Sequence, residues 1–175
     1  MSSDVALERV VLEGGAHPYV ILVSDPEPAR LRERARESCD DRWPHWSRSY
    51  CGPLALVAGW RHRVGVDVEF LAGSGESSWS TDDEDFRSAI MTPEERKHLL
   101  TLDDKDPAAS AVSLWCSKEA LAKALGTPRQ MDPARLTGPA LWNGSRRGAW
   151  RATFLDSPVL ESDAIAWVVY ESFRP

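Results

Sequence analysis

Short runs of apolar and β-branched residues, bounded by glycine and charged residues, recur along the chain and predict β-strands. Val5–Leu12 and Tyr19–Val23 flank the pair Gly14-Gly15, so they are expected to form two strands around a turn. Leu54–Trp60 and Val64–Phe70 are joined by a short basic turn and are expected to be neighbouring strands, with Val64–Phe70 inside the sheet. Two closing strands are predicted over Arg147–Leu155 and Ala164–Ser172.

Three other segments carry helix signals. The stretch from Pro28 to about Cys39 consists of strong helix formers, with a proline near its first turn. The sequence Thr92-Pro93-Glu94-Glu95 has the form of a capping box and predicts a helix that ends near Leu100. A longer helix over Ala108–Leu125 is expected to stop at Gly126.

Composition narrows the class of protein. A hydrophobic fraction of 42 % and eight tryptophans in 175 residues fit one compact unit or two small lobes packed together. The net charge of -6 argues against a general nucleic-acid binder, because such proteins present a basic surface to phosphates. The three cysteines lack CxxC spacing, which favours a reducing compartment, and the four histidines lack the spacing of a zinc site. We find no signal peptide or membrane-spanning run and expect a soluble, cytoplasmic protein that does not bind membranes.

Two carboxylates on one predicted strand carry the clearest chemical signal. Asp67 and Glu69 alternate with apolar residues along Val64–Phe70, so both project from the same face of the strand. Neighbouring carboxylates repel each other unless a positive group lies between them. Taken alone, the pair also fits the solvated face of an edge strand.

A second signal lies on the predicted helix that follows. Trp115, Glu119 and Lys123 are spaced four apart and fall on one stripe, with Lys118 beside them. Taken alone, this pattern also fits a helix-surface ion pair next to a core tryptophan. The conjunction of strand and helix indicates a magnesium and diphosphate site.

Four arginines alternate along the predicted helix that begins at Pro28. Only Arg30 with Arg34, and Arg32 with Arg36, share a side of a helix. The arginines therefore do not form one basic stripe. They belong either to a solvated helix surface or to a phosphate-binding site.

Two motifs carry a family resemblance. Gly65-Val66-Asp67-Val68-Glu69 and Trp115-Cys116-Ser117-Lys118-Glu119-Ala120-Leu121-Ala122-Lys123 match a Gly-x-Asp-x-Glu strand and a Trp-x-x-Lys-Glu-x-x-x-Lys helix without a gap. On these motifs the chain resembles the 4'-phosphopantetheinyl transferase superfamily, of the two-lobed, surfactin-synthetase-activating type, over about Ser47 to Leu155. The resemblance implies an α+β fold in which two similar small α/β lobes pack as a pseudo-dimer around the site. Residues 1–63 would form a shortened first lobe and residues 64–175 the second.

The resemblance implies an activity. It is the Mg2+-dependent transfer of the phosphopantetheine arm from coenzyme A to a serine of an acyl- or peptidyl-carrier protein, with release of 3',5'-ADP. Asp67, Glu69 and Glu119 would bind Mg2+, which reverses the sign of the site toward a diphosphate. Lys118 and Lys123 would offset phosphate charge, and Lys123 would stabilise the leaving oxygen. Glu119 or a metal-bound water would accept the serine proton, so Glu119, Lys123 and Asp67 are the expected catalytic residues.

The coenzyme-binding segment departs from the family pattern. Family members usually read Ser-x-Ser-His-Ser-Gly where this chain has Ser47-Arg48-Ser49-Tyr50-Cys51-Gly52. Tyr50 thus replaces a histidine that contacts a coenzyme A phosphate, and a phenol brings no positive charge at neutral pH. Ser47, Ser49 and Gly52 would approach the coenzyme through hydroxyl and backbone groups. Arg48 is a candidate for the missing charge.

Between the motifs, the resemblance places the surface that receives the carrier protein. This surface would comprise the loop Leu71–Asp85 and the helix after Thr92, where Arg96 and Lys97 are candidates for contact with an acidic carrier. We expect a monomer or small homo-oligomer. Two alternatives keep the fold: a protein that binds a carrier, coenzyme A or a nucleotide without transfer, and a recruited enzyme acting on a carrier-bound substrate. The presence of all three carboxylates and both lysines favours the transferase.

Overall fold

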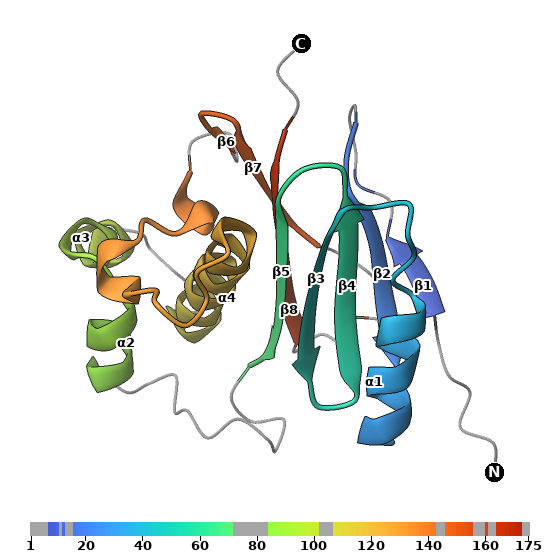
Figure 1. Ribbon diagram of the computed structural model, residues 1–175. Coiled ribbons are helices and arrows are strands. Elements are labelled where there is room, and N and C mark those ends of the chain that lie inside the picture. Colours follow the sequence, from blue (N-terminus) through green and yellow to red (C-terminus); the bar gives the residue numbers. More distant parts are fainter. Residues whose placement is uncertain are drawn as a thin grey trace.

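Two antiparallel sheets of four strands each form the framework of the protein (Figure 1). The structure is a computed structural model that describes residues 7–10, 12, 16–71, 84–101, 107–142, 146–155, 160 and 164–172. The first sheet has the order β1-β2-β4-β3, with β1 (Leu7–Val10), β2 (Tyr19–Ser24), β3 (His45–Cys51) and β4 (Leu54–Trp60). The second has the order β5-β8-β7-β6, with β5 (Val64–Phe70), β6 (Arg146–Arg147), β7 (Trp150–Phe154) and β8 (Ala164–Glu171).

Each sheet carries a helix. α1 (Pro28–Glu37) packs on the first sheet and α4 (Pro107–Leu125) on the second. Beyond α4, away from the sheets, lie α2 (Glu84–Ile90), α3 (Pro93–Thr101) and the 3-10 turn η1 (Pro133–Arg135) (Figure 1). A second 3-10 turn, η2 (Pro139–Leu141), contacts both α4 and β7. Within the described ranges, no helix combines the length and the apolar character needed to cross a membrane.

The largest hydrophobic cluster joins the facing sides of the two sheets. β5 contributes its four apolar side chains to this cluster: Val64, Val66, Val68 and Phe70. The residues that alternate with them, among them Asp67 and Glu69, face α4 instead. This arrangement confirms the alternation predicted for the strand. It also places the carboxylates between a rigid core and a long helix.

The three predicted helices are present, and the predicted capping signals are found at the start of α3 and at the end of α4. At the start of α3, the Thr92 N–H donates to Glu95 Oε2 at 2.7 Å and the Glu95 N–H donates to Thr92 Oγ1 at 3.2 Å, which completes the capping box. Beyond the end of α4, Gly126 adopts a φ of 76° and the Thr127 N–H donates to the Ala122 carbonyl at 3.0 Å. Local signals therefore fix the start of α3 and the end of α4.

The pairing of β4 and β5 differs from the sequence prediction. β4 pairs with β2 and β3, whereas β5 pairs with β8 and forms an edge of the second sheet. The expectation that Val64–Phe70 lies inside a sheet is therefore wrong, because the turn at residues 61–63 carries the chain from one sheet to the other. β3 and α2 have no counterpart among the predicted elements. β3 consists largely of polar residues, including the buried Ser47 and Ser49, and so lacks the β-branched pattern of a strand.

The mixture of antiparallel sheets and helices confirms an α+β fold. Every strand of the first sheet precedes residue 61, and every strand of the second follows residue 63. The division into lobes at 63/64, and the likeness of the two lobes as a pseudo-dimer, stay predictions. The predicted carrier-facing loop Leu71–Asp85 lies outside the described residues except at its ends.

α4 rests directly on β5 at Gly65. A Cβ atom at this position would lie 1.9 Å from the carbonyl oxygen of Ala120 and 2.5 Å from the backbone nitrogen of Ala124. Both are backbone atoms of the helix, which cannot turn aside as the end of a side chain can. Gly65, the glycine of the strand motif, therefore sets the distance between α4 and the carboxylates of β5.

Gly65→Ala should lower the free energy of unfolding by about 3 kcal/mol, because α4 must lift away from β5 to admit the methyl group. Urea denaturation measures the loss. Gly148→Ala is the control: a Cβ there meets nothing within 4 Å, so its positive φ alone should cost about 1 kcal/mol. Equal losses in the two variants would contradict the tight contact at Gly65.

Candidate functional site

Asp67 lies at the centre of the candidate site and is only 2 % exposed. Its Oδ1 accepts hydrogen bonds from the Ser49 hydroxyl at 2.7 Å and from the Lys123 ammonium at 2.6 Å. Lys123 also donates to Ser49 Oγ at 3.1 Å. These side chains come from β5, β3 and α4, so the triad ties the facing edges of both sheets to the helix.

Glu69 lies two residues further along β5, on the same face as Asp67. Burial, and then the charge of Asp67, raise the pKa of Glu69 to about 7. The Lys123 charge and hydrogen bonds from the Trp115 indole and the Cys51 thiol act in the opposite direction. Glu69 therefore keeps its proton to a higher pH than an exposed glutamate does.

Glu119 reaches the same region from α4. Burial, followed by the charge of Asp67, raises the pKa of Glu119, and the Lys123 charge lowers it. Asp67 thus acts on both glutamates, and Lys123 partly offsets the repulsion among the three carboxylates. The arrangement favours the arrival of a further positive charge.

A magnesium ion suits this set of oxygen donors. Among the residues that the structure describes, Asp67 Oδ2 is buried and accepts no hydrogen bond, and such an oxygen is costly without a partner. No group of three or more His, Cys, Asp and Glu side chains in the described part of the chain is already arranged to hold a metal ion. Asp67, Glu69 and Glu119 therefore do not converge here as a finished ligand set. Mg2+ typically uses one or two carboxylates together with substrate phosphates, which fits such an incomplete set.

Lys118 is not brought to this site, contrary to the sequence prediction. Its side chain is fully buried, and its ammonium donates to Glu95 Oε2 and to the Ile90 carbonyl at 2.6 Å each. It also donates to the Pro133 carbonyl at 2.8 Å. The reason is helical geometry, because five residues turn Lys118 about 140° around the helix from Lys123. Lys118 fastens α2, α3 and η1 to α4.

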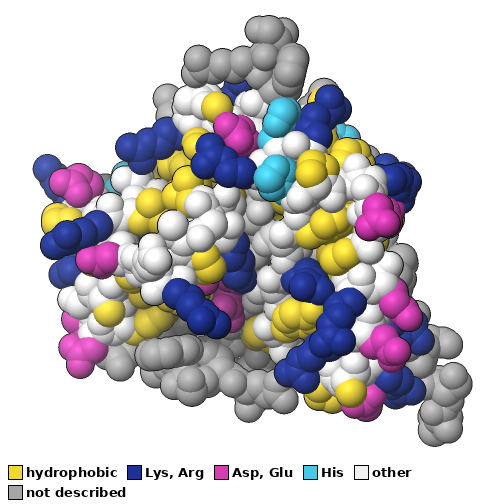
Figure 2. Space-filling model, in the orientation of Figure 1, with side chains coloured by type: hydrophobic (Ala, Val, Ile, Leu, Met, Phe, Trp, Pro, Cys, Tyr) yellow, Lys and Arg dark blue, Asp and Glu magenta, His cyan; other side chains and the backbone are white. Residues whose placement is uncertain are grey.

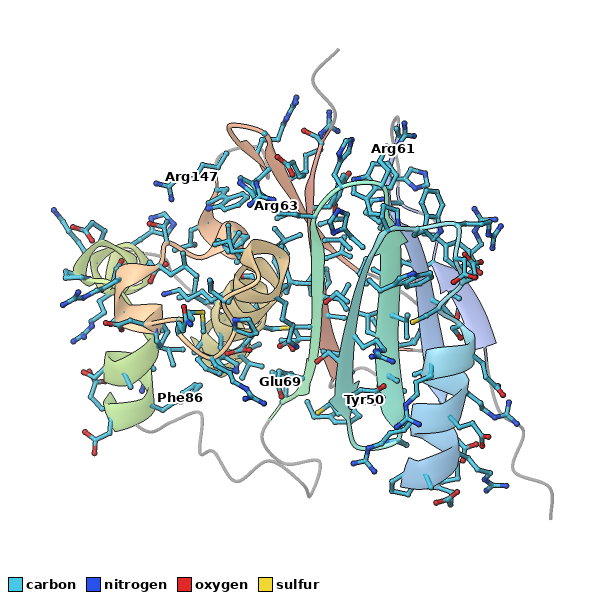
Figure 3. The ribbon with its side chains drawn as sticks, in the orientation of Figure 1. Tyr50, Arg61, Arg63, Glu69, Phe86 and Arg147 are labelled. Carbon is cyan, nitrogen blue, oxygen red and sulfur yellow. The ribbon has the colours of Figure 1, made fainter. Side chains whose placement is uncertain are left out.

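β3 runs beside β5 and presents a different set of residues on each face. Ser47 and Ser49 point toward β5, where the Ser47 hydroxyl accepts a hydrogen bond from the Val66 N–H at 3.0 Å. Arg48 and Tyr50 alternate with them on the other face, and Tyr50 is 41 % exposed. Figure 3 shows Tyr50 and Glu69 near the same end of these neighbouring strands. Tyr50 therefore remains accessible beside the carboxylates.

An open hollow of about 600 Å³ lies along this exposed face of β3. Its walls come from α1, β3 and the end of α4, and its described lining includes no acidic side chain. Figure 2 shows Lys and Arg side chains gathered over α1 and β3 beside a depression in the middle of this face. The hollow therefore suits an anion. It is lined by Arg32, Arg36, Trp46, Ser47, Arg48, Tyr50, Lys123, Gly126 and Pro128.

The arginines of α1 divide as their spacing predicts. Arg30 and Arg34 each lie 3.6 Å from a carboxylate oxygen of Asp25, which is almost fully buried. Arg32 and Arg36, on another side of the helix, line the hollow. One pair thus compensates a buried charge of the first sheet, and the other pair is available to a ligand.

Trp46 is a site residue that the sequence prediction missed. It lines the 600 Å³ hollow and also a second hollow of about 370 Å³ that continues past Gly126 toward Arg63. The available signal was its alternation with Arg48 and Tyr50 on one face of β3, which becomes visible only once β3 is known to be a strand.

Glu69→Gln should remove a pH dependence of stability. Between pH 4.5 and about 7 the folded protein keeps a proton on Glu69 that the unfolded chain has lost, so the free energy of unfolding falls as pH rises through this window. The glutamine variant should therefore be more stable than the wild type at pH 8, by about 2 kcal/mol for this partly exposed group. Urea midpoints from pH 5 to pH 8, without magnesium, measure the effect. Glu33→Gln on the exposed side of α1 is the control, and parallel pH profiles for wild type and Glu69→Gln would contradict the assignment.

Comparison with known proteins agrees with the motifs of this site. The family model of the 4'-phosphopantetheinyl transferase superfamily matches residues 63–162, which is more than half of the chain and includes β5 and α4. A search of curated proteins gives no match. Transferases of the phosphopantetheine group, with coenzyme A as co-substrate, make up this superfamily. The chain belongs to the 4'-phosphopantetheinyl transferase superfamily.

Proposed function

We propose that this protein transfers the 4'-phosphopantetheine arm of coenzyme A to a serine hydroxyl of an acyl- or peptidyl-carrier protein. The observation that carries the proposal is the position of Lys123. Its ammonium binds the buried Asp67 carboxylate, and the same residue lines the basic hollow. A phosphate chain lying in the hollow would therefore end at the carboxylates of β5 and α4.

The reaction replaces the phosphoanhydride bond of the coenzyme A diphosphate by a phosphodiester bond to serine. The serine oxygen forms a bond to the phosphorus that carries pantetheine, the bond from this phosphorus to the bridging oxygen breaks, and 3',5'-ADP leaves with that electron pair. Lys123 can offset the charge that grows on the leaving oxygen, since its ammonium sits between the hollow and Asp67. Ser49 and Asp67 hold Lys123 in place through the 3.1 and 2.6 Å contacts.

The serine proton needs an acceptor beside the reacting phosphorus. Glu119 is our candidate, because burial and the charge of Asp67 raise its pKa and so make it a stronger base than an exposed glutamate. It lies on the same stripe of α4 as Lys123, one turn earlier. The acceptor and the group that stabilises the leaving oxygen thus share one rigid helix.

Asp67, Glu69 and Glu119 are the residues that would hold Mg2+. When bound, the ion supplies positive charge to the diphosphate oxygens and relieves repulsion among the carboxylates. The unpartnered Asp67 Oδ2 supports this assignment, because Lys123 and Ser49 bind only Oδ1.

The basic hollow would bind the phosphates of coenzyme A through Arg32, Arg36 and Arg48. These three guanidinium groups can replace the charge that is lost where Tyr50 stands instead of histidine, and the phenol still offers one hydrogen bond. An acidic carrier would approach α3, on which Arg96 and Lys97 are exposed. We place the protein in a reducing compartment such as the cytoplasm, because all three of its cysteines are free.

Intact-mass analysis of apo carrier proteins, incubated with this protein, coenzyme A and Mg2+, should show addition of one phosphopantetheine. Asp67→Asn and Lys123→Ala should each slow the reaction at least about a hundredfold, because both act at the reacting diphosphate. Asp41→Asn, which changes an exposed carboxylate in the turn before β3 that lines neither hollow, is the control and should leave the rate unchanged. No mass gain across several carriers would overturn the proposed transferase activity. The alternative of a protein that binds without transfer would then remain, and calorimetry with coenzyme A would test it.

Replacing Arg32 and Arg36 together by glutamine should raise the Kd for coenzyme A by at least about tenfold, because two charged contacts to phosphate are lost. Isothermal titration calorimetry measures the change. The matched control lies on the same helix: replacing Arg30 and Arg34 by glutamine should leave the Kd unchanged and lower the melting temperature, because the buried Asp25 loses its partners. Equal Kd values for the two double variants would contradict the assignment of the hollow.

A further inference from the structure

Trp46 lies where the two hollows of the site meet. It lines the 600 Å³ hollow together with Arg48 and Tyr50, its neighbours on one face of β3. It also lines the 370 Å³ hollow, whose other side includes the last residues of α4, from Lys123, and Gly126 after the helix. A ligand that extends from one hollow into the other must therefore pass the indole ring.

The Trp46 ring is held in a fixed orientation. Its indole N–H donates a hydrogen bond to the Asp40 carbonyl at 3.0 Å. On the neighbouring strand, Gly59 is its register partner, and a Cβ atom there would lie 2.7 Å from Cη2 and 2.8 Å from Cζ3 of the ring. The ring thus covers a position that only a glycine leaves free, and it needs no rearrangement to offer a flat apolar surface.

The surroundings of this flat surface favour a nucleotide. Arg32, Arg36 and Arg48 lie in one hollow, Arg63 in the other, and Lys123 in both. Neither hollow includes an acidic side chain in its described lining. Phosphates require such cations, and a nucleic-acid base requires an aromatic or apolar plane on which to stack.

The spacing along β3 assigns the base to Trp46 and the diphosphate to the triad. Ser49, which binds Asp67 and Lys123, lies three residues after Trp46, a distance of about 10 Å along a strand. This leaves room for a ribose between a phosphate at Lys123 and a base at the indole ring. We propose that Trp46 is the platform on which the adenine of coenzyme A stacks, and that this contact makes the site prefer a purine base.

This inference rests on the proposed function, and nucleotides that lack the pantetheine arm test it without a transferase assay. Isothermal titration calorimetry compares adenosine 3',5'-bisphosphate, uridine 3',5'-bisphosphate and 4'-phosphopantetheine as ligands of the intact protein. The wild type should bind the adenosine compound more tightly than the uridine compound, since a purine offers the larger stacking surface. Trp46→Leu should weaken binding of the adenosine compound by about tenfold and reduce the preference for it over the uridine compound. Binding of phosphopantetheine should stay unchanged.

Two further variants sharpen the test. Trp46→Phe keeps an aromatic plane and should retain most of the affinity for adenosine 3',5'-bisphosphate. Phe154→Leu removes an aromatic ring that is 48 % exposed on β7 and lies outside both hollows. This variant should therefore bind both nucleotides as tightly as the wild type does. If Trp46→Leu does not fold, two measurements still test the role of Trp46. They are the preference of the wild type for the adenosine compound and the affinity of Trp46→Phe for it.

Equal affinity of the wild type for the two nucleotides, or unchanged binding in Trp46→Leu, would overturn the role of Trp46. If coenzyme A nevertheless binds and carriers are modified, only this inference fails and the transferase stands. Absence of binding for all these ligands and for coenzyme A would overturn the inference together with the proposed function.

Discussion

The contact between α4 and β5 at Gly65 is the constraint on which the site depends. Because this residue has no side chain, the backbone of the helix lies directly on the strand, and the facing stripe of the helix meets the carboxylates of the strand. Lys123 thereby reaches Asp67 at 2.6 Å, and Glu119 comes close enough for Asp67 to raise its pKa. A wider spacing would leave these charges buried without their partners, so the packing at Gly65 and the electrostatics of the site cannot be separated.

The two lysines of the helix motif serve different ends. Lys123 faces the site, whereas Lys118 and Glu95 form a buried ion pair on the far side of α4. Such a pair is costly to desolvate and holds only when its remaining groups are satisfied. Glu95 meets this condition, because it also accepts hydrogen bonds from the Thr92 and Gly138 N–H groups at 2.7 Å each. One capping-box carboxylate thus anchors α3 and the segment at Gly138 to α4, and α4 is held between this anchor and β5.

How much of this could be predicted from the sequence depends on the range of the interactions. Capping boxes, C-terminal glycines and alternating strands arise from neighbours in the chain, so α3, the end of α4 and the two faces of β5 were predictable. At residues 61–63 the chain passes from the first sheet to the second. The pattern of apolar and polar residues does not indicate this change, so the sheet to which β5 belongs could not be predicted. β3 escaped prediction because its buried serines are buried only by contact with β5.

The candidate site shows the same division. Helical spacing was enough to put Glu119 and Lys123 on one stripe and to separate Arg32 and Arg36 from Arg30 and Arg34. Which of these sides meets a hollow is decided by tertiary packing. Lys118 shows the limit of motif reasoning, since membership of a motif did not place it at the site, and its spacing of five residues from Lys123 already turns it to another side of α4.

A ligand in the basic hollow would also affect how the two sheets are held together. Their edge strands β3 and β5 meet beside the site through side-chain hydrogen bonds, at Ser47 with the Val66 N–H and at Ser49 with Asp67. A phosphate ligand held by Arg32 and Arg48 on one side and by Lys123 on the other would add a charged connection across this seam. Any ligand that binds only the folded state stabilises it by mass action. A phosphate ligand bound in the hollow would therefore stabilise the contact between the two sheets, and its affinity would be linked to the stability of the seam.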